Sequence, residues 1–539
     1  MINKKYIFYF YFLSIFLATN CSSYEPESDT NFIKARQNGS IASEGFERSK
    51  RFVEGWLPYA DSTTGMIPEN LNQGITTWNA HNSAADNYAF MVLTSFLLDQ
   101  TLYNGKMQNI LQTEKSATAR INTLPDEYSF EKQYFKYEKP DTTRIVFGAS
   151  EYIKDGLIPL LEYIGPSPWT DRMLKMIHDL SEIVDVIDQN MYHNPSTADE
   201  VNGELLQTLS RLYWKTGKRY FLDWAILIGD EYLLTDRNPV NAEKLRLRDH
   251  GCEILGGLSE LYVTLHFADK DKKQNYAQPL LELMDLILET GRNADGMFFN
   301  EINPRDRTVI DSTIVDNWGY IYDAYYSIYL IENKEEYRQA VINCMHTLNK
   351  NYRNFSWEGT SQDGYADAIE SAINLYNREP KEDISQWIDS EIKVMWAKQQ
   401  PDGIIEGWHG DGNFARTTLM YCLWKTQGAT IQPWSQGVEI GGYTAIDTLY
   451  LTLYSTIDWS GKVKLDFTRH KKWLNLPIDY PRINQFPEWY AVMDEIMYQV
   501  HFYPGNKIRI YPGSSLREGL AINLKKNETM YLKILPEEK

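Results

Sequence analysis

The chain has 539 residues, of which 43% are hydrophobic and 24% charged, which excludes both a disordered chain and a single small core. Its formal net charge is −19, and so acidic a chain binds nucleic acid or anionic lipid poorly by charge alone. We therefore expect no nucleic-acid partner. Aromatic residues make up 14% of the chain, which fits rings that stack on sugars and equally fits aromatic packing in a helical core.

The N-terminus reads as an export signal. Lys4 and Lys5 precede the apolar run "YIFYFYFLSIFLA", which is too short to span a bilayer and has the length of a signal core. The run ends at "LATNCSS", which resembles a bacterial lipoprotein signal, so residues 1–20 are expected to be removed and Cys21 lipidated. A plain secretory signal is the alternative. Residues 21–42 follow as an acidic tether, and the expected location is the outer membrane, facing the periplasm or the cell surface.

Residues 43–457 read almost entirely as helices of two alternating types. One type is apolar on all sides, as in "DNYAFMVLTSFLLD" and "DNWGYIYDAYYSIYLI", and is expected to be buried all round. The other is amphipathic, as in "DISQWIDSEIKVMW". The apolar helices recur about every 50 residues, which predicts helical hairpins. They are expected to begin near Asp86, Ser150, Asp199, Asp249, Asp316, Asp363 and Asn413.

Wholly apolar helices favour a closed ring over an open solenoid, because a solenoid exposes both of its helix layers. The predicted fold class is therefore mainly α, an (α/α)6–7 toroid. Residues 458–539 change character: "GKVKLDF", "YQVHFY", "KIRIYP", "LAINLK" and "MYLKIL" read as short strands of a small β-sandwich-like cap. The proline-rich "LNLPIDYPRINQFPEWY" is expected to pack across the toroid edge.

Acidic residues recur where the apolar helices begin. Asp86 and Asp316 each stand in an Asp-Asn-aromatic motif, and each could cap a helix or act in catalysis. In "SQDGYADAIESAINLY", Asp363, Asp367 and Glu370 share one helix face. Mutual repulsion raises the pKa of a carboxyl group, as a general acid requires. Asp363 or Asp367 is therefore the candidate acid, with Asp316 or Asp86 as its partner.

Other residues near these helix starts could bind a sugar. "IIEGWHGDGNFAR" holds an aromatic ring, an imidazole and two acids in a glycine-rich loop, and "LRLRDHGCE" offers Arg248 or His250 to a carboxylate. Arg248 could equally pair with Asp249 in a helix cap. The candidate sugar-binding residues are Trp78, His81, Arg248, His250, Trp318, Glu406, Trp408, His409 and Asp411. The spacing of Cys252, Cys344 and Cys422 matches no metal motif, so neither a metal cluster nor a cofactor is expected, while a Ca²⁺ site stays open.

The export signal, the repeated hairpins, the aromatic inner loops and the β tail together resemble the six-hairpin glycosidase superfamily. The unsaturated-glucuronyl hydrolases and exo-acting uronidases, among lipoproteins of Bacteroidota, are the most similar members. The resemblance implies a glycoside hydrolase that acts on a uronate-containing glycan through carboxylates at the N-terminal ends of the inner helices. A polysaccharide lyase on the same toroid and a non-catalytic glycan-binding surface lipoprotein are the alternatives. The sugar, its linkage and the oligomeric state stay open.

Overall fold

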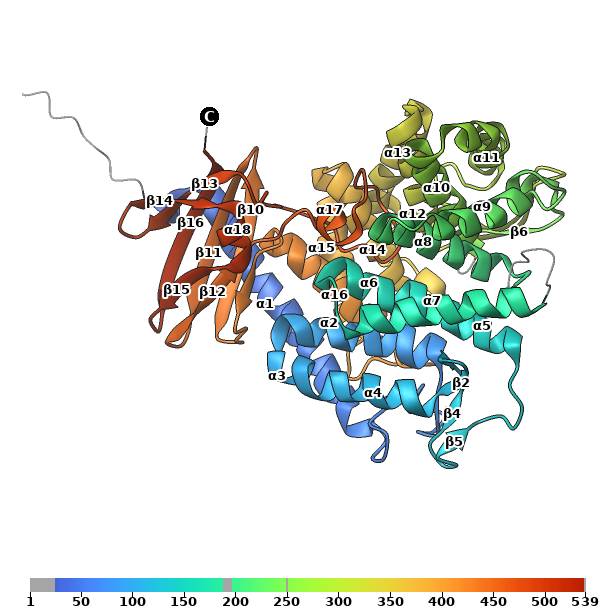
Figure 1. Ribbon diagram of the computed structural model, residues 1–539. Coiled ribbons are helices and arrows are strands. Elements are labelled where there is room, and N and C mark those ends of the chain that lie inside the picture. Colours follow the sequence, from blue (N-terminus) through green and yellow to red (C-terminus); the bar gives the residue numbers. More distant parts are fainter. Residues whose placement is uncertain (1–24, 188–195, 249–250, 538–539) are drawn as a thin grey trace, which may run out of the picture.

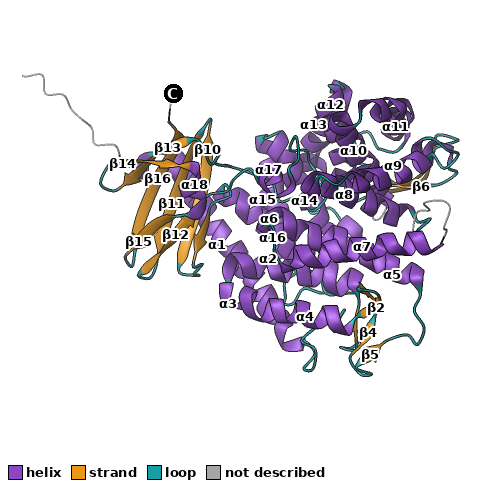
Figure 2. Cartoon of the chain, viewed as in Figure 1, coloured by secondary structure: helices purple, strands orange, loops and turns teal. Residues whose placement is uncertain are grey.

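The computed structural model describes residues 25–187, 196–248 and 251–537, and it shows a helical body beside a body of strands (Figures 1 and 2). The inner helices of the first body are η3 (Ala80–Tyr88) with α2 (Ala89–Leu98), α5 (Thr142–Glu151) with η5 (Tyr152–Leu157) and α6 (Ile158–Ile164), α8 (Asp199–Thr216), α10 (Gly251–Ala268), α12 (Trp318–Glu332), α14 (Gln362–Arg378) and α16 (Asn413–Thr426). The outer helices are α1 (Thr30–Trp56), α3 (Gln100–Leu102) with η4 (Tyr103–Met107) and α4 (Gln108–Ala117), α7 (Pro168–Ile187), α9 (Arg219–Leu233), α11 (Lys270–Thr290), α13 (Glu335–Asn351) and α15 (Glu382–Trp396).

The inner helices form a closed ring. Each packs against the next along the chain, and α16 returns to pack against α2. Every residue of α16 is buried, whereas α15 buries only one face, which includes Ile384, Trp387 and Ile388. The predicted α/α toroid is confirmed, and the described helices give it seven inner positions. Of these helices, none is long and apolar enough to cross a bilayer.

Short strands and short helices lie in the segments that connect the ring helices. Two insertions carry small sheets, at residues 118–135 and 292–314. The strands are β1 (Thr77–Trp78), β2 (Ala119–Ile121), β3 (Leu124–Pro125), β4 (Tyr128–Ser129), β5 (Tyr134–Phe135), β6 (Leu245–Arg246), β7 (Phe299–Asn303) and β8 (Thr308–Ile314). The short helices are η1 (Pro26–Ser28), η2 (Leu57–Tyr59), η6 (Pro239–Asn241), η7 (Trp357–Thr360), α17 (Arg469–Leu474) and α18 (Gly513–Glu518).

The strand-rich body is a sandwich of two antiparallel sheets. One sheet has the order β10-β11-β16-β13-β14 and the other β15-β12-β9, and side chains from both share one apolar core. The strands are β9 (Thr430–Gln432), β10 (Val438–Ala445), β11 (Thr448–Ser455), β12 (Trp459–Lys464), β13 (Met497–Tyr503), β14 (Lys507–Pro512), β15 (Leu520–Leu524) and β16 (Glu528–Pro536).

The expected domain boundaries are wrong at two places. The boundary at residues 457–458 falls inside the sandwich, whose first strand, β9, follows the last inner helix directly. The expected tether of residues 21–42 contains the first part of α1, which is a regular helix from Thr30 and packs on β10. A Cβ on Gly441 would lie 2.0 Å from the carbonyl oxygen of Ala35, so only glycine permits this approach. Cys21 lies outside the described residues, and its lipidation stays a prediction.

A proline-rich strap, residues 475–487, leaves the sandwich region and enters the ring. Tyr480, Ile483 and Phe486 join the core of the helical body. Polar groups of the strap are also buried: Arg482 donates to Glu162 of α6 at 2.8 Å, and the backbone N–H of Asn484 donates to Glu370 of α14 at 2.7 Å. The strap therefore packs inside the ring, whereas the sequence predicted packing across its edge.

Replacing Arg482 by methionine should destabilise the protein by about 3 kcal/mol, because Glu162 would keep a buried charge with one partner fewer. The exposed pair of Arg305 and Glu243 provides the control: Arg305→Met should cost no more than about 1 kcal/mol. Unfolding in urea, followed by tryptophan fluorescence, compares the two variants. An equal loss of unfolding free energy in the two variants would contradict the stabilising role of the strap.

Candidate active site

A cavity of about 290 Å³ opens at the N-terminal ends of the inner helices. Ile483 and Asn484 of the strap line it together with side chains of the ring. The ring contributes His81, Asn82 and Asp86 from η3, Phe147, Glu151, Lys154 and Asp155 from α5 and η5, Cys252 and Glu253 from α10, Asn317 and Tyr320 beside and on α12, and Asp363, Asp367, Asn413 and Arg416 from α14 and α16. Glu358, Trp408 and His409 come from loops and from η7.

Other residues cap the helices that carry the predicted acids. Asn79 accepts from the backbone N–H groups of Asn82 and Ser83 at the start of η3, so Asp86 lies inside that helix. Ser361 caps α14 by accepting from the N–H of Gly364 at 2.8 Å. Asn317, and not Asp316, occupies the N-cap position of α12. The capping alternative is therefore wrong for Asp86 and Asp316.

Asp363 and Asp367 lie one helical turn apart but have different partners. Asp367 accepts from Arg416 at 2.6 Å and from the hydroxyl of Tyr320 at 2.9 Å. Asp363 accepts only an amide N–H, from Asn413 at 2.9 Å, among the contacts of the described chain. Burial, followed by the charges of Asp367 and Asp411, raises the pKa of Asp363 well above its ordinary value. Asp363 is thus suited to hold a proton near neutral pH.

Asp86 faces the cavity from the adjoining helix. Its side chain is 25% exposed, and Oδ2 lies 3.9 Å from Nε2 of His409. Burial raises the pKa of Asp86 to about 7, against the opposing effect of His409. The neighbouring Asp411 has a pKa raised to about 6 by burial, and its Oδ1 accepts from the backbone N–H of Asn413. Asp86 can therefore exchange a proton close to neutral pH.

Asp316 lies at the start of α12, behind the cavity wall. Burial, with the charges of Asp367 and Glu358, raises its pKa to about 7. Arg248 is 3.9 Å from Asp316 and makes a shorter pair, at 2.6 Å, with Glu358. Glu358 has a left-handed backbone with φ of 43°, which a non-glycine residue adopts at a cost of about 1–3 kcal/mol. The surrounding contacts thus hold Glu358 where it meets Arg248.

The two cations that line the cavity are already neutralised. Arg416 lies between Asp367 at 2.6 Å and Glu370 at 2.7 Å. Lys154 is 1% exposed and lies between Asp155 at 2.7 Å and Glu253 at 2.6 Å. Among the described residues, neither Asp86 nor Asp363 has an arginine or lysine as a close partner, and burial is the largest cause of both raised pKa values.

The predicted sugar-binding residues separate into three groups. His81, Trp408 and His409 line the cavity, with the Trp408 side chain 66% exposed at its rim, and Asp411 is buried close by. Arg248 is engaged by Glu358, and Glu406 accepts from the backbone N–H of Asn72 at 3.0 Å, which fixes a loop. Trp78 and Trp318 are core residues, 2% and 0% exposed, and do not line the cavity.

We expected Asp86, Asp199, Asp249, Asp316 and Asp363 at one end of the ring. Asp86, Asp316 and Asp363 gather there, since their charges act on common neighbours. Asp199 is the first residue of inner helix α8 and lies at the same end, but its carboxylate accepts from Tyr232 of α9 at 2.6 Å and does not line the cavity. Asp249 and His250 lie outside the described residues.

Sequence reasoning missed several residues of the site. Glu151 and Asp155 in "ASEYIKDG" and Arg416 in "NFARTT" are charged residues inside apolar helices, and a buried charge in such a helix was a usable signal. Asn484 reaches the cavity only because the strap enters the ring, and nothing in its local sequence indicates this.

Comparisons with known proteins find resemblance at the level of solved structures. No protein-family model matches the chain, and no curated protein matches it. An inactive variant of an alpha-1,6-mannanase from Salegentibacter sp., in complex with alpha-1,6-mannotriose, is 12% identical with a TM-score of 0.41 over 70% of this chain and 98% of its own. A cellobiose 2-epimerase from Bacillus thermoamylovorans is 11% identical with a TM-score of 0.40 over the same shares. A possible member of the GH105 family from Salmonella enterica is 12% identical with a TM-score of 0.37 over 52% of this chain and 81% of its own. Likeness this distant leaves the activity to be argued from the site itself.

Replacing Asp316 by asparagine should stabilise the protein more at pH 8 than at pH 5. The folded-state pKa is raised to about 7, so stability falls as pH rises from the unfolded value near 4 and stays low above 7. Asparagine removes that loss, and below pH 5 it resembles the protonated acid. Melting temperatures at both pH values test this, with exposed Asp236→Asn as the control. A gain of equal size at both pH values would contradict the raised pKa.

Proposed function

We propose that the protein is a glycoside hydrolase. The observation that carries the proposal is a pair of carboxyl groups, Asp86 and Asp363, which reach one cavity from different inner helices and have no cation as a close partner apart from the imidazole of His409. Hydrolysis of a glycosidic bond normally requires two carboxyl groups, one of which is protonated while the other is ionised. Pairs whose environments separate their pKa values are suited to these two roles.

In this proposal Asp363 is the general acid and Asp86 is the base or nucleophile. Asp363 has a pKa well above its ordinary value, so it keeps the proton that the glycosidic oxygen must receive. Asp86 has a pKa of about 7 and is ionised above that pH, and His409 favours the ionised form. Asp367 acts through Asp363, because its charge raises the pKa of the acid. The charges of Asp411 and Glu358 have the corresponding effect.

A lyase is a weaker interpretation of the same cavity. A lyase would use a tyrosine or histidine base, and Tyr320 is the tyrosine of the described lining residues. Its hydroxyl donates to Asp367 at 2.9 Å, and burial raises its pKa well above the ordinary value. Such a phenol rarely loses its proton. A glycan-binding role alone would not require several carboxyl groups with raised pKa values at the bottom of a cavity.

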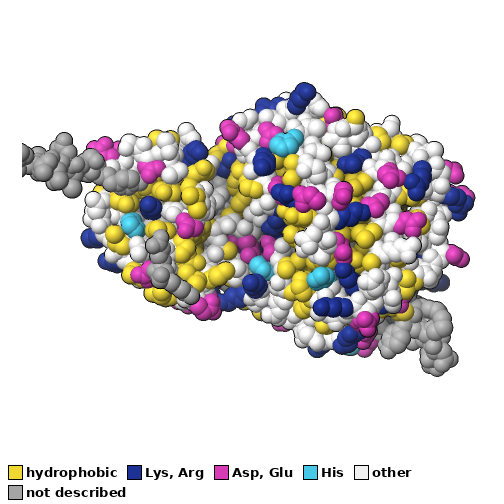
Figure 3. Space-filling model, turned by 90° about the horizontal axis from the view of Figure 1, so that it is seen from above, with side chains coloured by type: hydrophobic (Ala, Val, Ile, Leu, Met, Phe, Trp, Pro, Cys, Tyr) yellow, Lys and Arg dark blue, Asp and Glu magenta, His cyan; other side chains and the backbone are white. Residues whose placement is uncertain are grey.

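The expected exo-acting specificity for uronate stays part of the proposal. The residues predicted to bind the carboxylate of a uronate sugar were Arg248, His250 or His409. Arg248 is already paired with Glu358. Acidic and basic side chains are interspersed over the face that Figure 3 shows, so charge there does not single out an anionic glycan. The substrate screen should therefore compare neutral with uronate-containing oligosaccharides of matched length, and mass spectrometry should read the products.

On the substrate that the screen identifies, Asp363→Asn and Asp86→Asn should each lower kcat by about 10²- to 10⁴-fold. The wild-type kcat/KM should rise with pH through about 7, as Asp86 ionises. Asp236→Asn, at an exposed position, should leave the rate unchanged. Retention of the wild-type rate by either site variant, with a normal melting curve, would overturn the assigned roles. Unsaturated products, which absorb in the near ultraviolet, would indicate a lyase instead.

Trp408 should bind the sugar without taking part in the chemistry. Its ring stands at the cavity rim, 66% exposed, next to that of His409 at a centroid distance of 4.5 Å. Trp408→Ala should raise KM roughly tenfold and leave kcat within about twofold, since uniform binding changes KM alone. Trp408→Phe should restore most of the affinity, because a flat ring remains. A fall in kcat equal to the rise in KM would contradict this role.

A further inference from the structure

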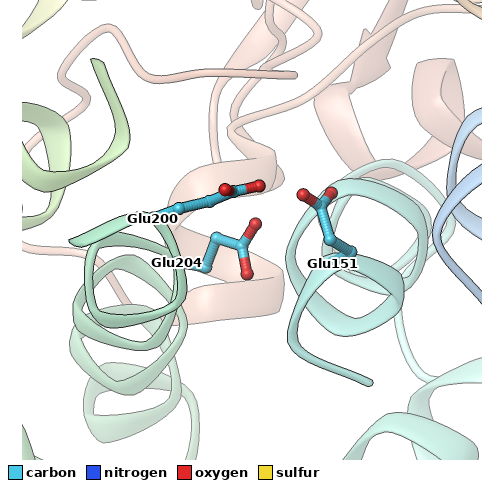
Figure 4. Close-up of side chains that lie close together, drawn as sticks. All are labelled: Glu151, Glu200 and Glu204. Carbon is cyan, nitrogen blue, oxygen red and sulfur yellow. The ribbon is translucent and has the colours of Figure 1, made fainter. Parts of the chain in front are cut away.

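Three glutamates converge at one point beside the cavity. Glu200 and Glu204 lie one turn apart on α8, and Glu151 ends α5 on the facing helix. Figure 4 shows the three carboxylates turned toward one another. One oxygen of each lies within 4.8 Å of the others. Like charges so close repel one another strongly, so a positive charge or a proton must accompany them.

Glu204 provides the observation that distinguishes this cluster from an ordinary acidic patch. Its side chain is 1% exposed, no N–H group of the described chain donates to either of its carboxylate oxygens, and its close polar contact is with Glu151 of the same cluster. An ionised group that is buried without such donors costs far more than one that is hydrogen-bonded. Lys154, the nearby cation, already lies between Asp155 and Glu253 at 2.7 and 2.6 Å. The buried carboxylate is therefore aimed into the cluster with its coordination sites unused.

We propose that Glu151, Glu200 and Glu204 form a binding site for a hard divalent cation, with Ca²⁺ as the expected ion. Carboxylate oxygens are the ligands that Ca²⁺, Mg²⁺ and Mn²⁺ prefer. Oxygens on opposite sides of Ca²⁺ stand about 4.6–5.2 Å apart, and an octahedral Mg²⁺ requires about 4.2 Å at most. All three oxygens lie within 4.8 Å of one another, which is compatible with Ca²⁺, and the flexible coordination of Ca²⁺ makes it the expected ion.

The ion would join two neighbouring segments of the ring beside the cavity. α5 packs on α8, and Glu151 also lines the cavity. A cation there would fix the direction of the Glu151 side chain and offset the negative charge of that wall. The site is separate from Asp86 and Asp363, so ion binding can be measured without a substrate and does not depend on the proposed hydrolysis.

Calcium binding is tested on the whole protein after treatment with a chelator. The wild type should bind one Ca²⁺ in isothermal titration calorimetry, and its melting temperature should rise by at least about 2 °C at 100-fold excess over the dissociation constant. NaCl at equal ionic strength should not reproduce the shift. Titration with Mg²⁺ should show weaker binding. Absence of a Ca²⁺-dependent shift in the wild type would overturn the proposal.

Two variants test whether the ion binds at these glutamates. Glu204→Gln removes a ligand charge but keeps the shape, and it should melt at or above the temperature of the ion-free wild type while losing the Ca²⁺ shift. Glu200→Gln, at the less buried end of the cluster, should weaken binding at least tenfold and serves if Glu204→Gln does not fold. Glu282→Gln, on the exposed side of α11, should keep the full shift. Retention of the shift by the Glu204 or Glu200 variant would place the ion elsewhere and overturn the proposal.

Discussion

The ring of helices can enclose a cavity only because the strap fills the space inside it. Helices that are apolar on all sides bury one another around a circle, but the side chains that point to the axis need a partner of their own. Tyr480, Ile483 and Phe486 supply apolar contacts there, and Arg482 and Asn484 satisfy buried acids of the inner helices. The cavity that remains lies above Ile483 and Asn484 and opens at the N-terminal ends of the helices.

The same burial sets the chemistry of the cavity. Arg416 and Lys154 each lie between two carboxylates, so the site contains more acid than the cations neutralise. The surplus appears as raised pKa values at Asp86, Asp316 and Asp363, with burial as the largest cause in each case. Each raised pKa lowers the stability of the folded chain above that pH. A fold retains such groups most readily where they serve a function.

The sequence predicted the parts of the fold that depend on local pattern. The helical period, the wholly apolar helices and the repeat length predicted the ring, because apolar residues occur in the sequence at the positions that become buried. Asp363, Asp367 and Asp86, which the same pattern places inside buried helices, line the cavity, and their catalytic roles stay predictions. The aromatic candidates Trp78 and Trp318 were wrong, since a tryptophan before an inner helix packs into the core as readily as it stacks on a ligand.

What the sequence could not predict depends on contacts between distant segments. The strap carries turn-forming prolines and no helical or strand period, so its local pattern indicates a loop and says nothing about the ring. Arg482 reaches Glu162 across 320 positions of the chain, and Asn484 reaches Asp155 across 329. The boundary between ring and sandwich was displaced because apolar strands β10 and β11, next to the last helix, resemble a buried helix in composition.

The β-sandwich is connected to the site through the chain, because the strap that lines the cavity joins two of its strands. It receives α1 through the Gly39–Gly441 contact, and the strap that fills the ring lies between β12 and β13 in the chain. Ile483 and Asn484 line the same cavity as Asp363 and Asp86, so removing the strap should widen the cavity and admit more water to the two carboxyl groups. Burial is the largest cause of both raised pKa values, so hydration would return them toward ordinary values. An acid that has lost its proton cannot protonate a leaving group, and the helical ring alone would then contain the proposed catalytic residues in the wrong protonation state.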